Sequence, residues 1–268
     1  MIDLVTVVFQ EELPILKLQA KSIDRYCQYA NIGKIYVIVN DSTLDTSEIN
    51  FNWWGSMKNR VVVVHRSTWP VTYVENGWLT QQLLKLLATG LSNNKWSMIL
   101  DAKTIFVNPV LEHGDKPQVG MLDIYPVFEP SRQIVNKLFG IDLQKQLGPG
   151  GVPFIMHNQT TVEMIKQIES LTNQSFPSWF QEQGMLTEFI LYSGYVISKY
   201  NTFSTLYTLD DPIIKPCNLC HSEVESFDRK FKEMSQSTTV SIHRNAWTHL
   251  TTDQQQQYLE FLRNRGIE

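Results

Sequence analysis

The sequence predicts an α/β fold built on a Rossmann-type mixed sheet that is mostly parallel and flanked by helices. Short apolar runs alternate with longer amphipathic segments through residues 1–100, as in strands joined by crossover helices. The apolar runs are rich in Val and Ile without strict polar alternation, which is typical of strands covered on both faces. Polar groups follow directly after the apolar run that ends at Asp101. Open α/β sheets bind their ligands at such strand ends.

The first half of the chain holds the elements that define this sheet. We expect strands at Ile2–Phe9, Lys34–Asn40, Val61–Val64 and Ser97–Asp101. A helix is expected from about Glu12 to Tyr29, with Pro14 in its first turn, where proline is tolerated because the first amides of a helix lack partners. A second helix is expected from about Val74 to Leu91, where leucines recur at helical spacing.

The second half is more mixed. We expect further strands at Gln118–Asp123 and Val152–Met156, and helices at Ser131–Phe139, Thr160–Leu171, Gly184–Tyr200 and Asp253–Arg265. The segment from Gly148 to Gly151 predicts a loop, because proline and glycine at this density break regular structure. No repeat and no linker interrupts the order, so residues 1–268 are expected to form a single domain.

The composition excludes several classes of protein. The 268 residues are 43% hydrophobic, which suffices for one core of the larger α/β kind. The net charge is -4 and the basic residues are dispersed, so we expect no nucleic-acid partner. No apolar run approaches the ~18 residues of a membrane span, and the first residues lack the basic stretch of a signal peptide. The cysteines Cys27, Cys217 and Cys220 suit a reducing compartment, so a cytoplasmic location is expected.

The segment from Trp96 to Pro109 is the most informative part of the chain. An apolar run ends in Asp101, Ala102 and Lys103, and the sequence then becomes apolar again. A buried strand that delivers polar groups to its carboxyl end produces this pattern. We therefore expect Asp101 at the edge of the sheet where a ligand binds.

A polar stripe runs along the helix expected before this strand. At ~100° per residue, one sector of the helix contains Trp78, Gln81, Gln82, Lys85 and Thr89, and leucines take most of the remaining surface. One interpretation is a solvated face with a partly covered tryptophan. The other is a cleft-lining face on which Lys85 meets a phosphate and Gln81 or Gln82 meets a hydroxyl.

A second stripe follows on the helix expected around residue 190. Helical spacing places Glu188, Tyr192 and Tyr195 on one face. A carboxylate flanked by two phenols can act as a general base with the groups that orient it. An ordinary amphipathic boundary between core and surface explains the same spacing.

Four motifs carry a resemblance to a known family. They are GWLTQQLLKL at 77–86, ILDAKTIFVNP at 99–109, GGVPFIMHN at 150–158 and TEFILYSGYV at 187–196. In order and spacing they resemble a family of GT-A-fold nucleotide-sugar glycosyltransferases, whose members read GW-x-x-QQ-x-x-K, then LD-x-D or LDAK, then G-x-PFI, then SEY-x-x-Y. Each motif alone is weakly specific, whereas four in the right order are fairly specific. The resemblance covers roughly residues 2–200 and implies a GT-A-like fold.

The resemblance implies roles for individual residues. Asp101 stands at the first acid of the family's Asp-x-Asp motif, beside the donor diphosphate, and Lys103 replaces the second acid. Glu188 is the implied base that deprotonates the acceptor hydroxyl. The residues implied to hold the nucleotide sugar are Val8, Phe9, Gln10, Asn40, Asp41, Trp78, Gln81, Gln82 and Lys85.

The same resemblance divides the chain into two halves. Residues 1–110 would form the nucleotide-sugar-binding half, and residues 111–268 the acceptor-side half. The loop from Gly148 to Gly151 would supply the floor of the acceptor side.

The substitution at position 103 leaves two arrangements open for the charge on the leaving diphosphate. Family members hold a divalent cation, Mn²⁺ or Mg²⁺, on two carboxylates. Here Asp101 can hold the cation with help from a distant ligand such as His243, because GT-A enzymes often take a final metal ligand from a C-terminal histidine. Alternatively, the ammonium of Lys103 takes over part of the cation's charge and Asp101 orients it.

The function that the resemblance implies is a hexosyltransferase activity. The expected donor is a nucleotide sugar, with UDP-sugars first, and the expected acceptor is a hydroxyl of a glycan or another molecule. One alternative is a GT-A scaffold that lost its cation and only binds a nucleotide or a glycan, and Lys103 favours it. A nucleotidyltransferase is less well supported, because the first strand leads into the acidic Phe9-Gln-Glu-Glu rather than into a glycine-rich phosphate loop.

Overall fold

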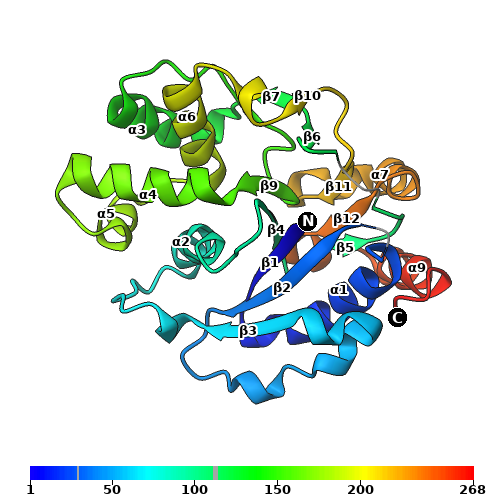
Figure 1. Ribbon diagram of the computed structural model, residues 1–268. Coiled ribbons are helices and arrows are strands. Elements are labelled where there is room, and N and C mark those ends of the chain that lie inside the picture. The colour runs from blue at the N-terminus through cyan, green and yellow to red at the C-terminus, as the bar shows by residue number, and fades with distance from the viewer. Residues whose placement is uncertain (29, 111–113) are drawn as a thin grey trace.

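The computed structural model describes residues 1–28, 30–110 and 114–268, and its core is a five-stranded sheet (Figure 1). The strands are β1 (Ile2–Val8), β2 (Ile32–Val39), β3 (Val61–His65), β4 (Trp96–Asp101) and β9 (Phe154–His157), in the order β3-β2-β1-β4-β9. The strands β1 to β4 run parallel, and β9 pairs antiparallel with β4. The mixed, mostly parallel sheet that the sequence predicts is confirmed.

Burial explains why β1 lies in the middle of this sheet. All of its residues are buried, because both of its faces are covered. Its two polar side chains have partners: Asp3 accepts a hydrogen bond from Lys34 N at 2.6 Å, and Thr6 donates one to Gln19 at 2.9 Å. Pairing of this kind removes most of the cost of burying a polar group.

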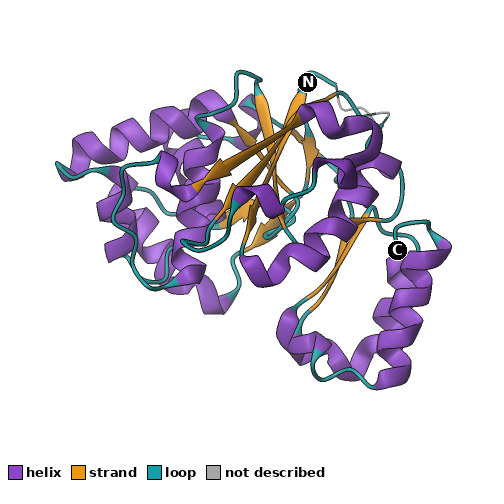
Figure 2. Cartoon of the chain, turned by 90° about the horizontal axis from the view of Figure 1, so that it is seen from below, coloured by secondary structure: helices purple, strands orange, loops and turns teal. Residues whose placement is uncertain are grey.

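Helices cover both sides of the central strands (Figure 2). They are α1 (Leu13–Tyr26), α2 (Gly77–Thr89), α3 (Glu129–Phe139), α4 (Asn158–Thr172), α5 (Phe176–Glu182), α6 (Glu188–Tyr200), α7 (Phe227–Met234), α8 (Arg244–Trp247) and α9 (Thr252–Asn264). The predictions for α1, α2, α3, α4, α6 and α9 are confirmed. The sequence did not predict α5, α7 and α8, because helices of 7, 8 and 4 residues are too short for a clear period.

Several predicted helix boundaries differ from the structure, and α2 and α1 show why. The helix α2 begins at Gly77, later than predicted, because the Asn76 side chain accepts a hydrogen bond from Leu79 N at 3.1 Å and caps the helix there. The helix α1 ends at Tyr26. Its predicted end, Tyr29, lies outside the described residues.

Smaller sheets complete the fold. The strands β5 (Ile105–Phe106), β11 (Pro216–Leu219) and β12 (Thr239–Ile242) form a sheet in the order β11-β12-β5, while β6 (Gln118–Val119) pairs with β10 (Thr208–Leu209) and β7 (Met121–Asp123) with β8 (Lys145–Leu147). The strand predicted over Gln118–Asp123 is therefore two strands with different partners. Short 3-10 helices lie at Gln10–Glu12, Thr46–Glu48, Phe51–Arg60, Arg66–Thr68, Pro126–Phe128, Phe203–Thr205 and His221–Ser226.

Buried apolar side chains form two clusters. The larger one surrounds the five-stranded sheet, and the smaller one joins β5, β11 and β12 to α7 and α9. Ile15 and Tyr26 of α1 pack against both clusters, so α1 connects them. Figure 2 shows the helix next to the C-terminus standing apart from the central sheet.

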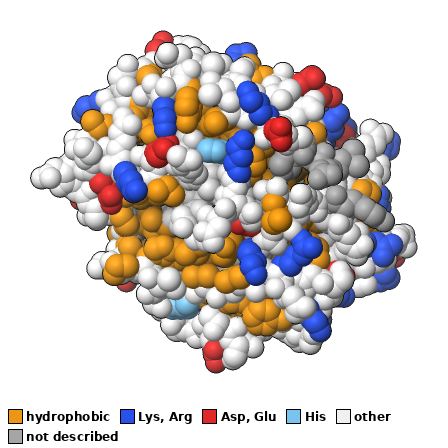
Figure 3. Space-filling view, in the orientation of Figure 1, with side chains coloured by type: hydrophobic (Ala, Val, Ile, Leu, Met, Phe, Trp, Pro, Cys, Tyr) orange, Lys and Arg blue, Asp and Glu red, His pale blue; other side chains and the backbone are white. Residues whose placement is uncertain are grey.

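The surface of the molecule shows no large basic stripe on the face drawn in Figure 3. Lysine and arginine side chains are spread over this face, and hydrophobic side chains gather in a band across it. Within the described ranges, no helix combines the length and the apolar character that crossing a bilayer requires.

The strand order locates the ligand crevice of the sheet. The chain builds outward from β1 in both directions, through β2 and β3 on one side and through β4 on the other. In the paired register Val7 of β1 lies opposite Asp101 of β4. Because open α/β sheets bind ligands outside the carboxyl ends of strands at such a switch point, Asp101 lies where a ligand site is expected.

Candidate functional site

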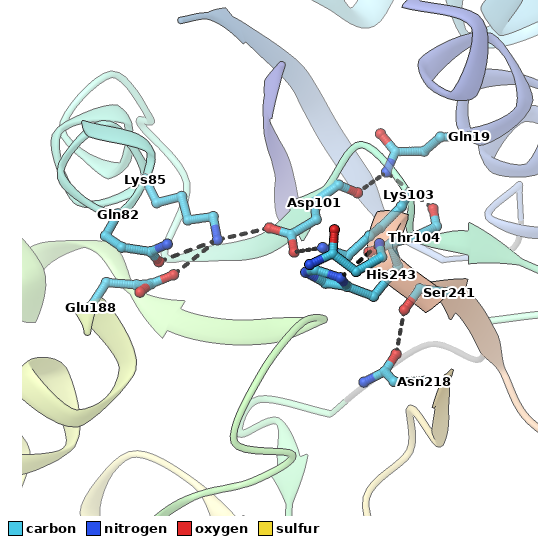
Figure 4. Close-up of polar contacts among 11 residues, drawn as sticks. Gln19, Gln82, Lys85, Asp101, Lys103, Thr104, Glu188, Asn218, Ser241 and His243 are labelled. Atoms are coloured by element: carbon cyan, nitrogen blue, oxygen red, sulfur yellow. Dashed lines mark hydrogen bonds and ion pairs between the residues drawn. The ribbon is translucent and has the colours of Figure 1, made fainter. Parts of the chain in front are cut away.

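Asp101 at the end of β4 contacts two ammonium groups (Figure 4). Lys85 Nζ lies 2.8 Å from Asp101 Oδ1, and Lys103 Nζ lies 3.1 Å from Asp101 Oδ2. Lys85 comes from α2, whereas Lys103 belongs to the turn after β4. Each oxygen of this carboxylate therefore faces a cation that the protein itself provides.

The turn after β4 is held by Gln19, a buried residue of α1. Gln19 Nε2 donates hydrogen bonds to Asp101 O at 2.6 Å and to Thr104 O at 3.0 Å. Thr104 N donates to Asp101 O at 2.9 Å and closes the turn. A side-chain amide that bonds two backbone oxygens fixes their relative position. The helix α1 thereby sets the direction in which Asp101 and Lys103 point.

Glu188 opens α6 and faces the same lysine. Lys85 Nζ lies 3.0 Å from Glu188 Oε1, and Glu188 is 0% exposed. Thr187 caps the helix, since its Oγ1 accepts a hydrogen bond from Ile190 N at 3.3 Å, and this places Glu188 in the first turn. A carboxylate is stabilised there by the partial positive charge of the helix start. Capping also explains why α6 begins later than the sequence predicts.

Gln82 and Trp78 of α2 extend this network. With its nitrogen toward the carboxylate, the Gln82 amide donates to both oxygens of Glu188, and its oxygen accepts from Trp78 Nε1 at 3.2 Å. In the opposite orientation the amide oxygen would face the carboxylate and accept only from Lys85, at 3.5 Å. We assign the first orientation because it pairs each donor with an acceptor.

The polar stripe of α2 faces the interior. Gln82 is 5% exposed, Lys85 is 2% exposed and Thr89 is 0% exposed. The interpretation of this stripe as a solvated face is therefore wrong, and the cleft-lining interpretation fits. Trp78 stays 39% exposed at the mouth of the cleft, and Gln81 is half-buried.

Burial and pairing set the charges of these groups. Burial raises the pKa of Asp101, but the ammonium groups of Lys85 and Lys103 outweigh burial and hold that pKa well below its usual range. Burial lowers the pKa of Lys85, but Asp101 and Glu188 outweigh it and raise that pKa above its ordinary value. Burial raises the pKa of Glu188, and Lys85 offsets only part of the rise. Of the two acids, Glu188 is therefore the one that takes up a proton more readily.

A cavity of about 160 Å³ lies against these side chains. Its wall is built by Thr187–Phe189 at the start of α6, by the loop Gly150–Val152, and by Trp78, Gln82, Lys85, Asp101, Phe128 and Gln146. Pockets for drug-sized ligands measure roughly 300–1,000 Å³, so this cavity suits one ring-sized group rather than a whole nucleotide sugar. Gly150 and Gly151 of the glycine-rich loop lie against this cavity, whereas the acceptor-side role that the resemblance implies stays a prediction.

The residues predicted to hold the base and ribose lie at the carboxyl ends of β1 and β2. Asn40 N donates to Val8 O at 2.9 Å, which brings the two strand ends side by side. Arg66, just after β3, donates to Asn40 Oδ1 at 3.4 Å. Phe9 packs on the start of α2, since its ring lies 3.3 Å from where a Cβ on Gly77 would stand.

Asp41 and Gln10 continue this edge. The Asp41 carboxylate accepts from Thr43 N at 2.8 Å and from Thr43 Oγ1 at 2.7 Å. These hydrogen bonds, together with one from the Gln10 backbone, hold the pKa of Asp41 below its ordinary value. The carboxylate therefore stays ionised at neutral pH. A role of these residues in nucleotide binding stays a prediction.

His243 lies at the end of β12, next to Lys103 and Asp101 (Figure 4). Its Nδ1 accepts a hydrogen bond from Asn245 N at 3.3 Å and caps α8. Burial lowers the pKa of His243, and the charge of Lys103 lowers it further. The ring is therefore neutral at neutral pH, the form in which histidine binds metals.

The side chains around Asp101 do not fit a divalent cation as they are arranged. Both oxygens of Asp101 face ammonium groups, at 2.8 and 3.1 Å. In the part of the chain that the structure describes, no three His, Cys, Asp or Glu side chains are grouped so that they could hold a metal ion. A cation on Asp101 and His243 stays a prediction, and the observed contacts agree with the alternative of an ammonium in its place.

The phenol side chains of Tyr192 and Tyr195 in α6 are buried in the hydrophobic core. Tyr192 OH shares a hydrogen bond with Tyr207 OH at 2.7 Å and accepts one from His157 N at 2.9 Å. Tyr195 is buried, and its ring centroid lies 5.6 Å from that of Phe139. The groups that orient Glu188 come instead from α2, so helical spacing alone identified the acid but not its neighbours.

Four residues of this region were missed by sequence reasoning. Gln19 is a buried polar residue inside an amphipathic helix, where nothing in the pattern distinguishes it from a surface position. Arg66 and Phe128 lie in or beside 3-10 helices that carry no clear period. Gln146 stands two residues before the glycine-rich loop, and that proximity was the signal that could have identified it.

Comparison with solved structures supports the fold. A crystal structure of an active-site mutant of LgtC superposes with a TM-score of 0.52 at 10% identity, over 98% of this chain and 95% of that chain. The bifunctional glycosyltransferase WbbM gives 0.49 at 10% identity over 90% of this chain, which spans only 45% of that longer protein. GlyE from Streptococcus pneumoniae TIGR4 gives 0.48 at 11% identity, over 97% of this chain and 59% of that chain. At 10% identity, the likeness to LgtC establishes the fold alone.

Comparison of the sequence with curated proteins finds no match. The predicted GT-A-like α/β class is confirmed by the sheet and by the superposition on LgtC. The family model described as "Family of unknown function (DUF6492)" matches residues 6–250, and the chain belongs to this family.

Proposed function

We propose that this protein is a glycosyltransferase that moves a hexose from a nucleotide sugar, with UDP-sugars as the expected donors, to a hydroxyl acceptor. The observation that supports this most is the convergence of Asp101, Lys85 and Glu188 on one cavity at the switch point of the sheet. The fold shared with LgtC agrees with the proposal. The motif order that resembles GT-A glycosyltransferases agrees with it as well.

The reaction requires charge stabilisation at one place and proton removal at another. The acceptor oxygen forms a bond to the anomeric carbon, while the bond from that carbon to the diphosphate oxygen breaks and its electron pair leaves with the nucleoside diphosphate. The acceptor hydroxyl gives up its proton. A catalyst therefore needs a positive group beside the diphosphate and a base beside the acceptor.

We assign the first task to Lys103. Its side chain is 27% exposed, whereas that of Lys85 is 3% exposed, so Lys103 is the ammonium that an entering phosphate can reach. Asp101 holds Lys103 Nζ at 3.1 Å and thereby keeps the ammonium in place before the donor arrives. A preorganised cation stabilises the developing charge without further rearrangement. In this proposal the ammonium stands where family members place a divalent cation.

We assign the second task to Glu188. The residue lines the cavity, its carboxylate faces Lys85 at 3.0 Å, and burial raises its pKa. A raised pKa makes the carboxylate a stronger base as long as it is ionised, and Lys85 favours the ionised form. The acceptor proton would pass to Glu188 as the new glycosidic bond forms.

The donor nucleotide would lie along the edge formed by β1, β2 and β3. Asn40 and Arg66 offer an amide and a guanidinium there, 3.4 Å apart, and Asp41 offers an ionised carboxylate next to them. Such groups suit the hydroxyls of a ribose and the edge of a base. In this arrangement the diphosphate would lie between that edge and Lys103.

A second candidate function is binding without transfer. It is favoured by one observation: both oxygens of Asp101 are already engaged by ammonium groups. A scaffold of this kind would hold a nucleotide or a glycan but would not promote departure of the diphosphate. Ligand binding without turnover distinguishes this function from the first.

Two measurements test the proposal. Calorimetry with UDP, GDP, CMP and ADP, each with Mn²⁺ and with EDTA, shows whether a nucleotide binds. An assay of nucleotide released from the matching sugar donor then shows whether transfer or hydrolysis occurs. Binding together with release above background supports a transferase, and binding alone supports the second candidate. If none of the four nucleotides binds, both candidate functions are contradicted.

A further inference from the structure

The side-chain amide of Gln146 is buried, and its nitrogen has no hydrogen-bond partner among the residues that the structure describes. Gln146 belongs to β8 and is 1% exposed. Among the described residues, none accepts a hydrogen bond from Gln146 Nε2. A buried amide donor without an acceptor is destabilising by about 1–3 kcal/mol. Such donors are rare in native proteins, and a ligand that accepts the hydrogen bond is one reason for a protein to contain one.

The backbone around Gln146 holds this amide beside the cavity. Leu147 N donates to Ser193 Oγ of α6 at 3.2 Å, which fixes β8 against that helix. Gly150 adopts a positive φ of 74°, and a Cβ there would lie 2.6 Å from Leu122 Cδ1 and 3.3 Å from Gln146 Nε2. The glycine therefore leaves the space that the amide needs. Gln146 and Gly150 both line the cavity that Lys85, Asp101 and Glu188 also line.

The cavity wall offers complementary groups for a hydroxylated ring. Asp101 Oδ1 is buried and contacts Lys85 as an ion pair at 2.8 Å, but it has no aligned hydrogen-bond donor among the described residues. A ligand hydroxyl can donate to such an oxygen and accept from Gln146 Nε2. A sugar ring carries several hydroxyls, and a cavity of about 160 Å³ accommodates a group of that size better than a nucleotide.

The charges in the wall restrict the class of sugar. The cavity is lined by two carboxylates, Asp101 and Glu188, and by Lys85, whose ammonium already faces both of them. A sugar carboxylate entering this space would meet two like charges and an ammonium that is already paired. Like charges at short range in a water-poor site are strongly unfavourable. An uncharged sugar avoids this repulsion.

We propose that the cavity is the site of the transferred sugar, that Gln146 donates from Nε2 to an oxygen of that sugar, and that the sugar is uncharged rather than a uronic acid. This inference rests on the proposed function, because it specifies the donor of the same site. Gln146 is then a specificity-determining residue, and the sugar supplies the acceptor that its Nε2 lacks among the described residues.

The variant Gln146→Met separates a binding role from a structural role. Methionine keeps the length of the side chain and removes the amide, while Gln144→Met is the matched control at an exposed position two residues away. Removing a buried donor that has no partner relieves a cost, so the melting temperature of Gln146→Met should equal or exceed that of the wild type. A clearly lower melting temperature, with unchanged sugar binding, would make Gln146 a structural residue and overturn the proposal.

Binding measurements by calorimetry test the ligand. UDP is compared with UDP-glucose, UDP-galactose, UDP-N-acetylglucosamine and UDP-glucuronic acid, and GDP with GDP-mannose. At least one uncharged donor should bind more tightly than its free nucleotide, and UDP-glucuronic acid should not. In Gln146→Met the affinity for that donor should fall about tenfold, which corresponds to the loss of one hydrogen bond, while the affinity for the free nucleotide stays constant. In Gln144→Met both affinities should match the wild type.

The outcomes distinguish the two proposals. If no nucleotide binds, the proposed function fails and the inference fails with it. If nucleotides bind but the sugar adds no affinity, or if Gln146→Met leaves the added affinity unchanged, only the inference fails. Binding of UDP-glucuronic acid as tightly as the uncharged donors would overturn the assignment of sugar class.

Discussion

Lys85 Nζ lies 2.8 Å from Asp101 Oδ1, and this buried ion pair connects the helix before β4 to the end of that strand. The same ammonium lies 3.0 Å from the buried Glu188, so Lys85 is shared between two acids, of which Asp101 also contacts Lys103. A buried charge group of this kind contributes little net stability while it is intact, but it is costly to leave incomplete. It also fixes the relative positions of α2, β4 and α6 around the cavity.

Removing the shared ammonium should destabilise the fold. In Lys85→Met both carboxylates lose their buried counterion, which should lower the free energy of unfolding by about 3–5 kcal/mol. Urea unfolding of the wild type and the variant measures this difference. The control Lys58→Met, at an exposed position, should change it by less than ~0.5 kcal/mol. Equal stability of the two variants would show that Lys85 is not the counterion of the network.

Activity should fall at acidic pH through the titration of Glu188. The pKa of Glu188 lies above its ordinary value of 4.5 because burial disfavours the charge. The base works only when it is ionised, so activity should be complete above that raised pKa and lost as the pH falls through it. A profile of kcat/KM against pH shows this limb at a pH above 4.5.

Two variants identify the acid behind this limb. Glu188→Gln should lower kcat by about 10²–10⁴-fold and abolish the acid limb, because the base is gone. Burial also raises the pKa of Glu12, so Glu12→Gln is the matched control and should keep the limb. If the limb persisted in Glu188→Gln and disappeared in Glu12→Gln, the titrating acid would be Glu12 and the assignment to Glu188 would be wrong.

The charge at position 103 should decide whether the site uses a metal. Donor binding by the wild type should be equal in Mn²⁺ and in EDTA, because Lys103 supplies the positive charge. Lys103→Asp restores the acid of the Asp-x-Asp motif, so its binding should be weak in EDTA and recover in Mn²⁺. Lys103→Met should bind weakly in both. A wild type that needs Mn²⁺ would instead support a cation on Asp101 and His243.

The sequence predicted the central sheet well because its signal is local. Apolar runs identify a strand without knowledge of its neighbours. Runs rich in valine and isoleucine mark β1, β2 and β3, and the apolar run that ends at Asp101 marks β4. Helix starts were less accurate, because they depend on single capping side chains such as Asn76 and Thr187. The short strands β5 and β10, with 2 residues each, show no pattern that predicts a strand.

The candidate site was predicted only in part, for a related reason. Asp101 stood out because it ends an apolar run, and Lys85 and Glu188 because they lie on polar stripes of predicted helices. The structure brings the three together. The partners that position them are non-local. Gln19 reaches the turn at Asp101 across 82 positions, and Lys85 reaches Glu188 across 103. Contacts of that range depend on how helices pack, which periodicity does not encode.

Nucleotide release from a sugar donor is the most direct test of Asp101 at the centre of a glycosyl-transfer site. The wild type and Asp101→Asn would be incubated with the donor that binds best in calorimetry, and the free nucleoside diphosphate would be measured over time. The proposal predicts steady release by the wild type, and a large loss in Asp101→Asn, because the neutral amide no longer forms ion pairs with Lys103 and Lys85. Equal release by a properly folded Asp101→Asn variant would contradict it.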